Sequence, residues 1–329
     1  MRKLRWLAVC LYMTLLIVPM ITYTLFYDPP AAKKRDIPKD ERSAAFKTEI
    51  KLYLKKEDKV VTLDAYDYIC GVVCAEMSPD FEKEALRAQA VAAFTYAVNK
   101  MEYTINNPDA DNGHSGGYVC DDYNHCKAYI PTDEAVKKLG SKKYEKIADA
   151  VYDSLGFVIT YGGAPINAVF HSICCGKTAD AAEVWGNDVP YLKSVPCEGD
   201  KQADGYQTKV TVKKSEFSDI LESELGVTLP SDADNWIGDI TLYPSGYVNT
   251  VSIGGTEYAG TLVRRLFSLR SAAFDVCLKD ENVVFTVRGY GHGVGLSQSG
   301  ANEMAKDGKS FEQILTYFYK DVTIEQYKK

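Results

Sequence analysis

The pattern of apolar and polar positions divides the chain into three parts, and the first part is apolar. Residues 6–26 carry no charge, and a membrane-spanning helix needs about 20 apolar residues. Arg2, Lys3 and Arg5 precede this run, and basic flanks tend to stay on the cytoplasmic side. We therefore predict that residues 1–27 form a cytoplasmic tip and a single-pass membrane anchor. A cleaved signal peptide is the alternative interpretation.

The second part, residues 28–46, is rich in proline and in charged residues, which predicts a solvated linker next to the membrane. The third part, residues 47–329, is long enough to bury a sizeable core. We expect it to form one domain on the outer side of the membrane. A segment at about 201–285 is a candidate inserted subdomain within it.

In the first third of this domain, the sequence pattern predicts a strand followed by two helices. Residues 49–63 alternate and contain β-branched side chains, which is typical of a strand. Asp64 is a suitable cap for the short helix that follows, and the Ser-Pro pair at 78–79 interrupts it. Alanines recur at helical spacing in 81–103, which predicts a long helix. Glu76 therefore falls at the joint between two helices.

The rest of the domain predicts a mixture of strands and helices without regular alternation. Residues 104–130 have the composition of a loop, and 133–154 that of a helix. We predict strands at 157–161, 165–171, 208–212, 239–243 and 247–253, and short helices at 216–225, after 261 and at 311–318. This order favours an α+β fold with mixed or antiparallel sheets over a doubly wound parallel sheet.

Composition narrows the range of ligands. The net charge of −7 gives no electrostatic attraction to nucleic acid, so we expect no nucleic-acid partner. Tyrosine is abundant, with 23 residues against 12 phenylalanines. Tyrosine rings stack on sugar faces and their hydroxyls form hydrogen bonds, which suits a carbohydrate site. Tyrosines on half-buried surfaces explain the number equally well.

Two histidines and two cysteines gather in the 104–130 loop. His114, Cys120, His125 and Cys126 together make a set of ligands that is common at tetrahedral zinc sites. The sequence therefore predicts a bound Zn²⁺. Four protein ligands leave no open position, so the ion would be structural. A disulfide between the two cysteines is the alternative.

Four stretches of the chain carry a resemblance to a known family. They are LDAYDYICGVVCAEMSPDFEKEALRAQAVAAFTYA at 63–97, VFHSICCGKTADAAEVWGNDVPYLKSV at 169–195, LVRRLFSLRSAAFDV at 262–276 and RGYGHGVGLSQSGANEMAKDGKSFEQIL at 288–315. In these stretches the chain resembles the stage II sporulation protein D family, which also includes amidase enhancers. The stretches follow the family's order, and the first and the fourth are highly specific.

The resemblance implies a lytic transglycosylase. Such an enzyme would cleave the MurNAc–GlcNAc linkage of peptidoglycan glycan strands during cell-wall remodelling in sporulation engulfment. The resemblance places it in the engulfing mother-cell membrane. It also implies strands already stripped of their stem peptides, and as partners a membrane-anchored amidase and the scaffold of the engulfment complex.

The resemblance also assigns residues to the site. Glu76, in the A-E-M motif, corresponds to the family's catalytic acid, and Arg87 and Tyr191 correspond to residues that line the family's site. Members usually read A-R-T-Y where this chain has Phe94, so a basic residue of the family is missing here.

The glycine-rich stretch 288–300 is the other candidate wall of the groove. As part of the family pattern, His292, Ser297 and Gln298 are candidate substrate-binding residues. Spaced glycines let the backbone approach a ligand closely or adopt positive φ. A tight crossing within the core, with a hydrogen-bonded histidine, is the alternative.

One carboxylic acid is sufficient for this chemistry. Glycoside hydrolases normally use a second carboxylate, as nucleophile or as base for water. In a lytic transglycosylase the 6-hydroxyl of muramic acid attacks its own anomeric carbon, so Glu76 can act alone. The first alternative is a non-catalytic peptidoglycan-binding module that enhances an amidase. The second, a zinc peptidase, has no H-E-x-x-H motif to support it.

Overall fold

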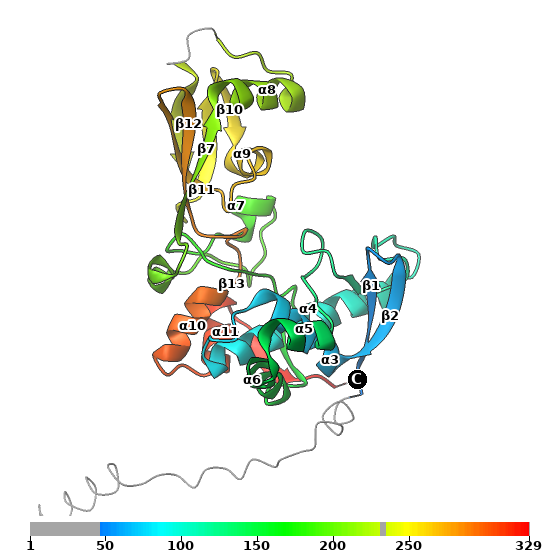
Figure 1. Ribbon diagram of the computed structural model, residues 1–329. Helices are drawn as coiled ribbons and strands as arrows, with labels where there is room; N and C mark the ends of the chain where they lie inside the picture. The colour runs from blue at the N-terminus through cyan, green and yellow to red at the C-terminus, as the bar shows by residue number, and fades with distance from the viewer. Residues whose placement is uncertain (1–46, 231–234, 329) are drawn as a thin grey trace, which may run out of the picture. The chain divides into compact units, whose positions relative to one another are not determined.

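The structure, a computed structural model, describes residues 47–230 and 235–328 (Figure 1). Among these residues no helix is both long enough and apolar enough to span a membrane. The predicted anchor at 1–27 and the predicted linker at 28–46 lie outside the described residues.

The described chain opens with a β-hairpin that leads into the helix carrying Glu76. The elements are β1 (Glu49–Leu54), β2 (Lys59–Asp64), α3 (Ala65–Glu76), α4 (Lys83–Asn106) and β3 (Val119–Cys120). β1 pairs antiparallel with β2 and parallel with β3. Asp64 caps α3 as predicted, since its Oδ1 accepts the N–H of Tyr66 at 2.8 Å. α3 ends at Glu76, which confirms that this residue lies at a joint between helices.

α4 is the central helix of the larger of two apolar cores, and its alanines let neighbouring helices approach closely. Ala88 and Ala92 are fully buried. Close approach also governs α3, where Gly71 lies against Tyr129. A Cβ at position 71 would lie 2.2 Å from the Tyr129 ring, so only glycine fits there. Small residues in α3 and α4 therefore let neighbouring segments approach both helices closely.

The larger core extends from Ile50 to Tyr319 and takes in both ends of the described chain. Its remaining elements are α5 (Thr132–Leu139), α6 (Ser141–Tyr152), β4 (Phe157–Tyr161), β5 (Ala164–Pro165), β6 (Phe170–His171), α7 (Ala181–Trp185), the 3₁₀ helix η2 (Glu198–Gln202), β13 (Leu296–Ser297), α10 (Gln298–Lys306), α11 (Phe311–Phe318) and β14 (Thr323–Gln326). β14, β4 and β5 form one small sheet. β6 pairs parallel with β13, which brings the histidine segment beside the glycine-rich stretch.

The smaller core is built from residues between Val212 and Val287. Its elements are β7 (Gln207–Lys213), α8 (Lys214–Leu225), β8 (Ile237–Leu242), β9 (Val248–Ile253), β10 (Thr256–Ala259), α9 (Gly260–Leu266), β11 (Ala273–Lys279) and β12 (Asn282–Arg288). The strands form two three-stranded antiparallel sheets, β10-β9-β8 and β11-β12-β7. This core largely coincides with the segment at about 201–285 that is a candidate inserted subdomain, whose boundaries stay a prediction.

The predicted α+β class is confirmed, with small mixed and antiparallel sheets. Three predicted elements were wrong in detail. The strand predicted over 49–63 is the hairpin of β1 and β2, with a turn at 55–58. The helix predicted over 133–154 is two helices, because Gly140 adopts a φ of +80° between α5 and α6. The strand predicted over 165–171 is two short strands, β5 and β6, that belong to different sheets.

Candidate functional site

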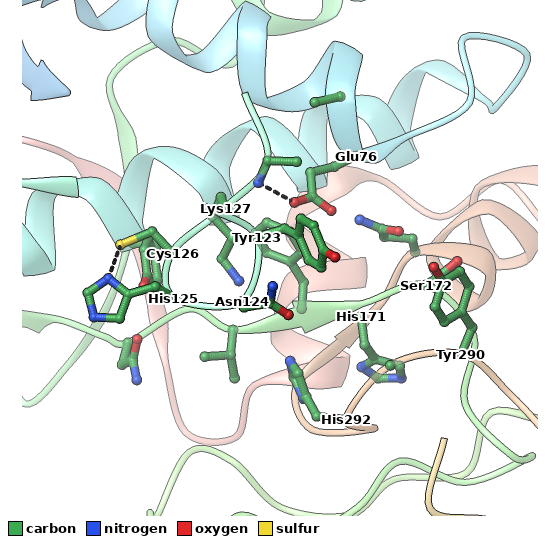
Figure 2. A pocket seen from close by; sticks show the side chains of 18 of the residues that line it. Glu76, Tyr123, Asn124, His125, Cys126, Lys127, His171, Ser172, Tyr290 and His292 are labelled. Carbon is green, nitrogen blue, oxygen red and sulfur yellow. Dashed lines mark hydrogen bonds between the residues drawn. The ribbon is translucent and has the colours of Figure 1, made fainter. Parts of the chain in front are cut away.

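A cavity of about 770 Å³ lies where α3 ends (Figure 2). Segments far apart in the sequence line it: the end of α3, the loop 123–128, the β6 region and the glycine-rich stretch around His292. Figure 2 shows Glu76 and Lys127 on one side of this space and His171 and His292 on the other. The cavity therefore depends on the pairing of β6 with β13, which positions its second wall.

Glu76 is held in the cavity wall by a backbone hydrogen bond. Its Oε1 accepts the N–H of Ala128 at 2.9 Å, so the loop 123–128 fixes the carboxyl group (Figure 2). The side chain is half-buried and opens to the cavity. Among the described residues that line the cavity, Glu76 is the only carboxylic acid. A second carboxylate of the kind that hydrolases use is not part of this lining.

Three basic side chains line the same cavity. Lys127 is 8% exposed, and its Nζ lies 3.7 Å from the ring centroid of Phe170 and 4.8 Å from that of Tyr96. Burial lowers the pKa of Lys127 to about 8, and the nearby carboxyl group of the site opposes that shift. Lys100 and Arg264 are the other two. No local sequence pattern indicates a role for Lys127, because it is a single lysine in a loop.

The two histidines of the far wall are neutral at pH 7. Burial lowers the pKa of His171 to about 4, and its Nδ1 contacts the carbonyl of Val294 at 3.1 Å. Burial, followed by the proximity of His171, holds the pKa of His292 well below its usual range. The ring of His292 lies 5.6 Å from that of His171 and 5.3 Å from that of Trp185. These imidazoles can hydrogen-bond a ligand but bring no charge.

Of the five predicted substrate-binding residues, the structure brings two to the cavity. His292 lines it, with Nδ1 accepting the N–H of Val294 at 3.1 Å. Gln298 lines it from the start of α10, and its Nε2 donates to Oε1 of Gln89 at 3.4 Å. Both belong to the glycine-rich stretch, so this stretch does form a wall.

The other three do not line the cavity. Arg87 donates to Glu84 at 2.9 Å and its guanidinium lies 4.1 Å from the ring centroid of Phe311, so its own neighbours hold it. Ser297 is fully buried, where it donates to Asp200 and caps α10. Tyr191 does not line the cavity itself but contacts Asn167, which does.

The contacts of Tyr191 and Phe94 show where these two side chains lie. The Tyr191 hydroxyl accepts the N–H of Asn167 at 3.2 Å, and it is Asn167 that faces the cavity. Phe94 is 1% exposed and packs edge-on against Tyr327 at 5.9 Å. The position where family members carry arginine is thus part of the core in this chain.

Three exposed aromatic side chains were not identified from the sequence. Tyr123 is 74% exposed, Trp185 44% and Tyr290 47%, and all three line the cavity. Exposed aromatic rings around a cavity are suited to stacking on a ligand. No local pattern distinguishes them from other surface aromatics, because they lie on three separate segments.

The predicted zinc ligands lie together at the edge of the cavity. Their ligating atoms all lie within 4.8 Å of one another, and the cysteines are free thiols. His114 Nε2 is 3.2 Å from His125 Nδ1 and 3.2 Å from Cys126 Sγ, and Cys120 Sγ is 3.4 Å from His125 Nδ1. Tetrahedral coordination at usual zinc bond lengths separates ligand atoms by about 3.3–3.8 Å. The three distances above come close to that spacing, whereas Cys126 Sγ lies 4.0 Å from His125 Nδ1.

The electrostatics of the cluster also suit a cation. Interaction with the Cys120 thiol, followed by that with His114, lowers the pKa of Cys126, which favours its thiolate. Cys126 and His125 line the cavity as well, and Ala128, two residues on, donates to Glu76. The cluster and the carboxyl group are therefore linked by one short segment.

Comparisons with known proteins agree with the resemblance found in the sequence. The sequence model of the family described as "Stage II sporulation protein" matches residues 53–161. The chain is 36% identical to stage II sporulation protein D of Bacillus subtilis (strain 168) over 281 residues, which cover 84% of this chain and 79% of that protein. It is 35% identical to the Bacillus amyloliquefaciens protein of the same name, over 84% of this chain and 78% of that one.

A more distant relative carries a different name. The protein called "Amidase enhancer" of Bacillus subtilis (strain 168) is 25% identical over 308 residues, which cover 78% of this chain and 40% of that protein. The extent of the first two matches decides the family. This chain belongs to the stage II sporulation protein D family.

Proposed function

We propose that this protein is a lytic transglycosylase that cleaves the MurNAc–GlcNAc linkage of peptidoglycan glycan strands and leaves 1,6-anhydro-MurNAc ends. The observation that carries this proposal is the lone Glu76 among the described residues that line the cavity. Attack by the sugar's own 6-hydroxyl needs one acid, whereas the hydrolytic mechanisms need two. Membership of a sporulation family supports a role in cell-wall remodelling during engulfment.

In this mechanism one carboxyl group both gives and takes a proton. Glu76 donates its proton to the glycosidic oxygen while the bond between that oxygen and C1 of MurNAc breaks. The 6-hydroxyl then bonds to C1, and its proton returns to the Glu76 carboxylate, so that the enzyme ends as it began. The Ala128 N–H holds Oε1 at 2.9 Å, which leaves Oε2 for the proton transfers.

The aromatic side chains at the cavity suit the binding of sugars. Tyr123, Trp185 and Tyr290 are exposed there and can stack on pyranose rings. His292 and Gln298 offer uncharged hydrogen-bonding groups for hydroxyls and acetamido groups. Neutral hydrogen-bonding groups beside aromatic faces are a suitable lining for a glycan.

We also propose that His114, Cys120, His125 and Cys126 bind a structural Zn²⁺. The spacing of their ligand atoms supports this assignment. The ion would supply no activated water, because four protein ligands complete its coordination. It would instead hold the segment that donates the Ala128 N–H to Glu76.

The proposed setting is the outer face of a membrane. The apolar run at 6–26 supports a single-pass anchor, with the domain outside and, in a sporulating cell, in the engulfing mother-cell membrane. A membrane-anchored amidase that strips stem peptides, and an engulfment scaffold, are the proposed partners. The relative named as an amidase enhancer is compatible with an amidase partner.

Mass spectrometry of products from peptide-free glycan strands tests the proposal. We expect 1,6-anhydro ends with the full chain and none with Glu76→Gln. Asp80→Asn is a matched control, because Asp80 is an exposed carboxylate four residues away that pairs with Lys143. Reducing ends without anhydro sugar would point to a hydrolase instead.

A second candidate function is a non-catalytic peptidoglycan-binding enhancer of an amidase. The 25% identity to the protein named "Amidase enhancer" is the observation that favours this second candidate function. Glycan binding without cleavage, together with stimulation of an amidase by both the unaltered chain and Glu76→Gln, would support this candidate over the transglycosylase.

A further inference from the structure

More positively charged than negatively charged side chains line the cavity. Lys100, Lys127 and Arg264 face a single carboxylic acid, Glu76, while both far-wall histidines are neutral. The whole chain carries the opposite sign, with a net charge of −7. A local excess of positive charge in an acidic protein focuses the field on an anionic ligand.

Lys127 is the basic residue whose position is hardest to explain by the fold alone. It is 8% exposed, and within the described parts of the chain its ammonium has no ion pair within 4.0 Å and no hydrogen-bond acceptor. The rings of Phe170 and Tyr96 support the charge through their faces. Aromatic faces cannot accept all three N–H bonds of an ammonium group, so the Lys127 ammonium still has N–H groups that can donate to a ligand.

Glu76 is not the missing partner. It acts on Lys127 at longer range, but its Oε1 is occupied by the Ala128 N–H and the two side chains form no ion pair. A buried charge without a paired neighbour is costly for folding. Such a charge beside a candidate catalytic residue is therefore a candidate ligand-binding group.

The position of Lys127 in the chain limits which part of a ligand it can reach. It is the residue before Ala128, so it approaches the cavity from the loop that fixes Glu76. An anion bound by Lys127 would lie close to the bond that Glu76 protonates. In a glycan strand, that anion has to belong to the sugar that contains the reacting anomeric carbon.

We propose that Lys127 binds the lactyl carboxylate of the muramic acid residue whose glycosidic bond is cleaved. This inference rests on the proposed function and adds a specificity-determining residue to it. The lactyl group is attached at C3 of the same ring as the reacting C1. Its carboxyl group is a free carboxylate when the stem peptide is absent and an uncharged amide when the peptide is attached. Lys127 thereby distinguishes the two forms of the strand by charge.

Lys100 and Arg264 are less suited than Lys127 to binding the lactyl carboxylate. Lys100 Nζ lies 5.5 Å from the Tyr96 ring centroid, at the half-buried end of α4. Arg264 already donates from Nε to the carbonyl of Leu269 at 3.3 Å. These two residues can attract the strand at longer range, whereas Lys127 supplies the buried contact.

A binding experiment that needs no cleavage tests this inference. The full chain carrying Glu76→Gln is titrated calorimetrically with two short MurNAc-GlcNAc oligosaccharides. One has free lactyl carboxylates, and in the other each carboxylate is a methylamide. We expect the free acid to bind about 10- to 100-fold more tightly, the usual range for one charge-assisted hydrogen bond.

Variants then assign the preference to one residue. Adding Lys127→Met should equalise the two affinities by weakening only the free acid, and Lys127→Arg should restore part of the preference. Lys83→Met is the matched control, because Lys83 lies on α4 and pairs with Asp153 outside the cavity. It should keep the full preference.

Three results would overturn the assignment: equal affinities in the presence of Lys127, no binding of the free acid, or a preference that survives Lys127→Met. Failure of the proposed function is a separate result, since it is read from anhydro products of the unaltered chain. A protein that does not cleave can still show or lack the charge preference.

Discussion

The two apolar cores of this protein differ in what they bury. The larger core is surrounded by buried polar groups, including Gln89, Lys127, His171 and Asp200. Among the described residues 207–288, around the smaller core, the buried polar side chains are Ser245 and Ser271 only, and Phe217 is stacked on Phe267 at a centroid distance of 4.7 Å. Buried polar groups cost free energy unless they are hydrogen-bonded, so apolar packing cannot account for them.

Some of the buried polar groups of the larger core, such as Lys127 and His171, line the cavity. Several buried polar atoms beside the larger core have no hydrogen-bond partner among the described residues, such as His171 Nε2 and Asn167 Oδ1. Both residues line the cavity. The smaller core contributes Arg264 to that lining, from α9, and otherwise serves as a support.

The largest expected effect separates chemistry from stability. Glu76→Gln should lower the rate of glycan cleavage by about 10²- to 10⁴-fold, the usual contribution of a general acid. The amide can still accept the Ala128 N–H, so the free energy of unfolding should change little. Product analysis and urea unfolding of the same preparation measure the two quantities. A variant that cleaves at the normal rate would exclude Glu76 as the acid.

A substitution in the smaller core should have the opposite profile. Phe217→Ala should reduce the free energy of unfolding by about 3–5 kcal/mol, because Phe217 is fully buried among aromatic rings. Cleavage per folded molecule should remain unchanged at temperatures where the variant is folded. A specific loss of turnover in folded protein would show that the smaller core contributes more than support.

The next prediction concerns the cluster of His114, Cys120, His125 and Cys126, which packs beside the larger core and has no counterpart in the smaller one among the described residues. If it binds zinc, Cys126→Ser should lower the zinc content by about one ion per chain. It should also remove about 3 kcal/mol of stabilisation when free zinc exceeds the dissociation constant about 100-fold. Cys277→Ser is the control, because Cys277 is exposed and is not one of the four clustered residues. Elemental analysis of both variants decides the point, and equal zinc contents would contradict the assignment.

Acid should destabilise the larger core through His171. The folded pKa of about 4 lies below the unfolded value of about 6.5, so the native state favours the neutral imidazole. Its contribution is complete above about pH 6.5 and is lost as the pH falls towards 4, by up to about 3 kcal/mol. His171→Asn keeps a donor near the Val294 carbonyl and removes the titration. Unfolding curves from pH 7 to 4 should therefore fall less steeply for this variant.

The smallest effect tests the reassignment of Arg87. Because Arg87 faces Glu84 and Phe311 and not the cavity, Arg87→Met should cost about 1 kcal/mol of stability and leave the KM for glycan unchanged. Steady-state kinetics and thermal unfolding measure both. A rise in KM without loss of stability would return Arg87 to the binding site.

Local features of the fold were predictable because they depend on neighbouring residues. The Asp64 cap, the end of α3 at Glu76 and the long alanine-rich helix follow from spacing and capping. The break at Gly140 was missed because helical periodicity continues on both sides of it. The four side chains predicted as zinc ligands lie close together because they share one segment of the chain, whereas zinc binding itself stays a prediction.

The rest of the site was less predictable because it is assembled from distant segments. On α4, Tyr96 and Lys100 face the cavity, and Arg87 lies nine residues, or about 2.5 turns, before Tyr96. Half a turn places Arg87 on the opposite side of the helix. The resemblance identified the helix correctly but could not supply this rotation. Lys127 lies in a loop, where no periodicity applies.

The pairing of β6 with β13 has a consequence for the order in which activity can arise. Glu76 is made early in synthesis, whereas His292 and Gln298 come more than 200 residues later. The region that matches the family model, 53–161, supplies only the first wall of the cavity. A nascent or truncated chain therefore contains the acid without the opposite half of its binding site. Under the proposed function, glycan cleavage would begin only when nearly the whole polypeptide has been made.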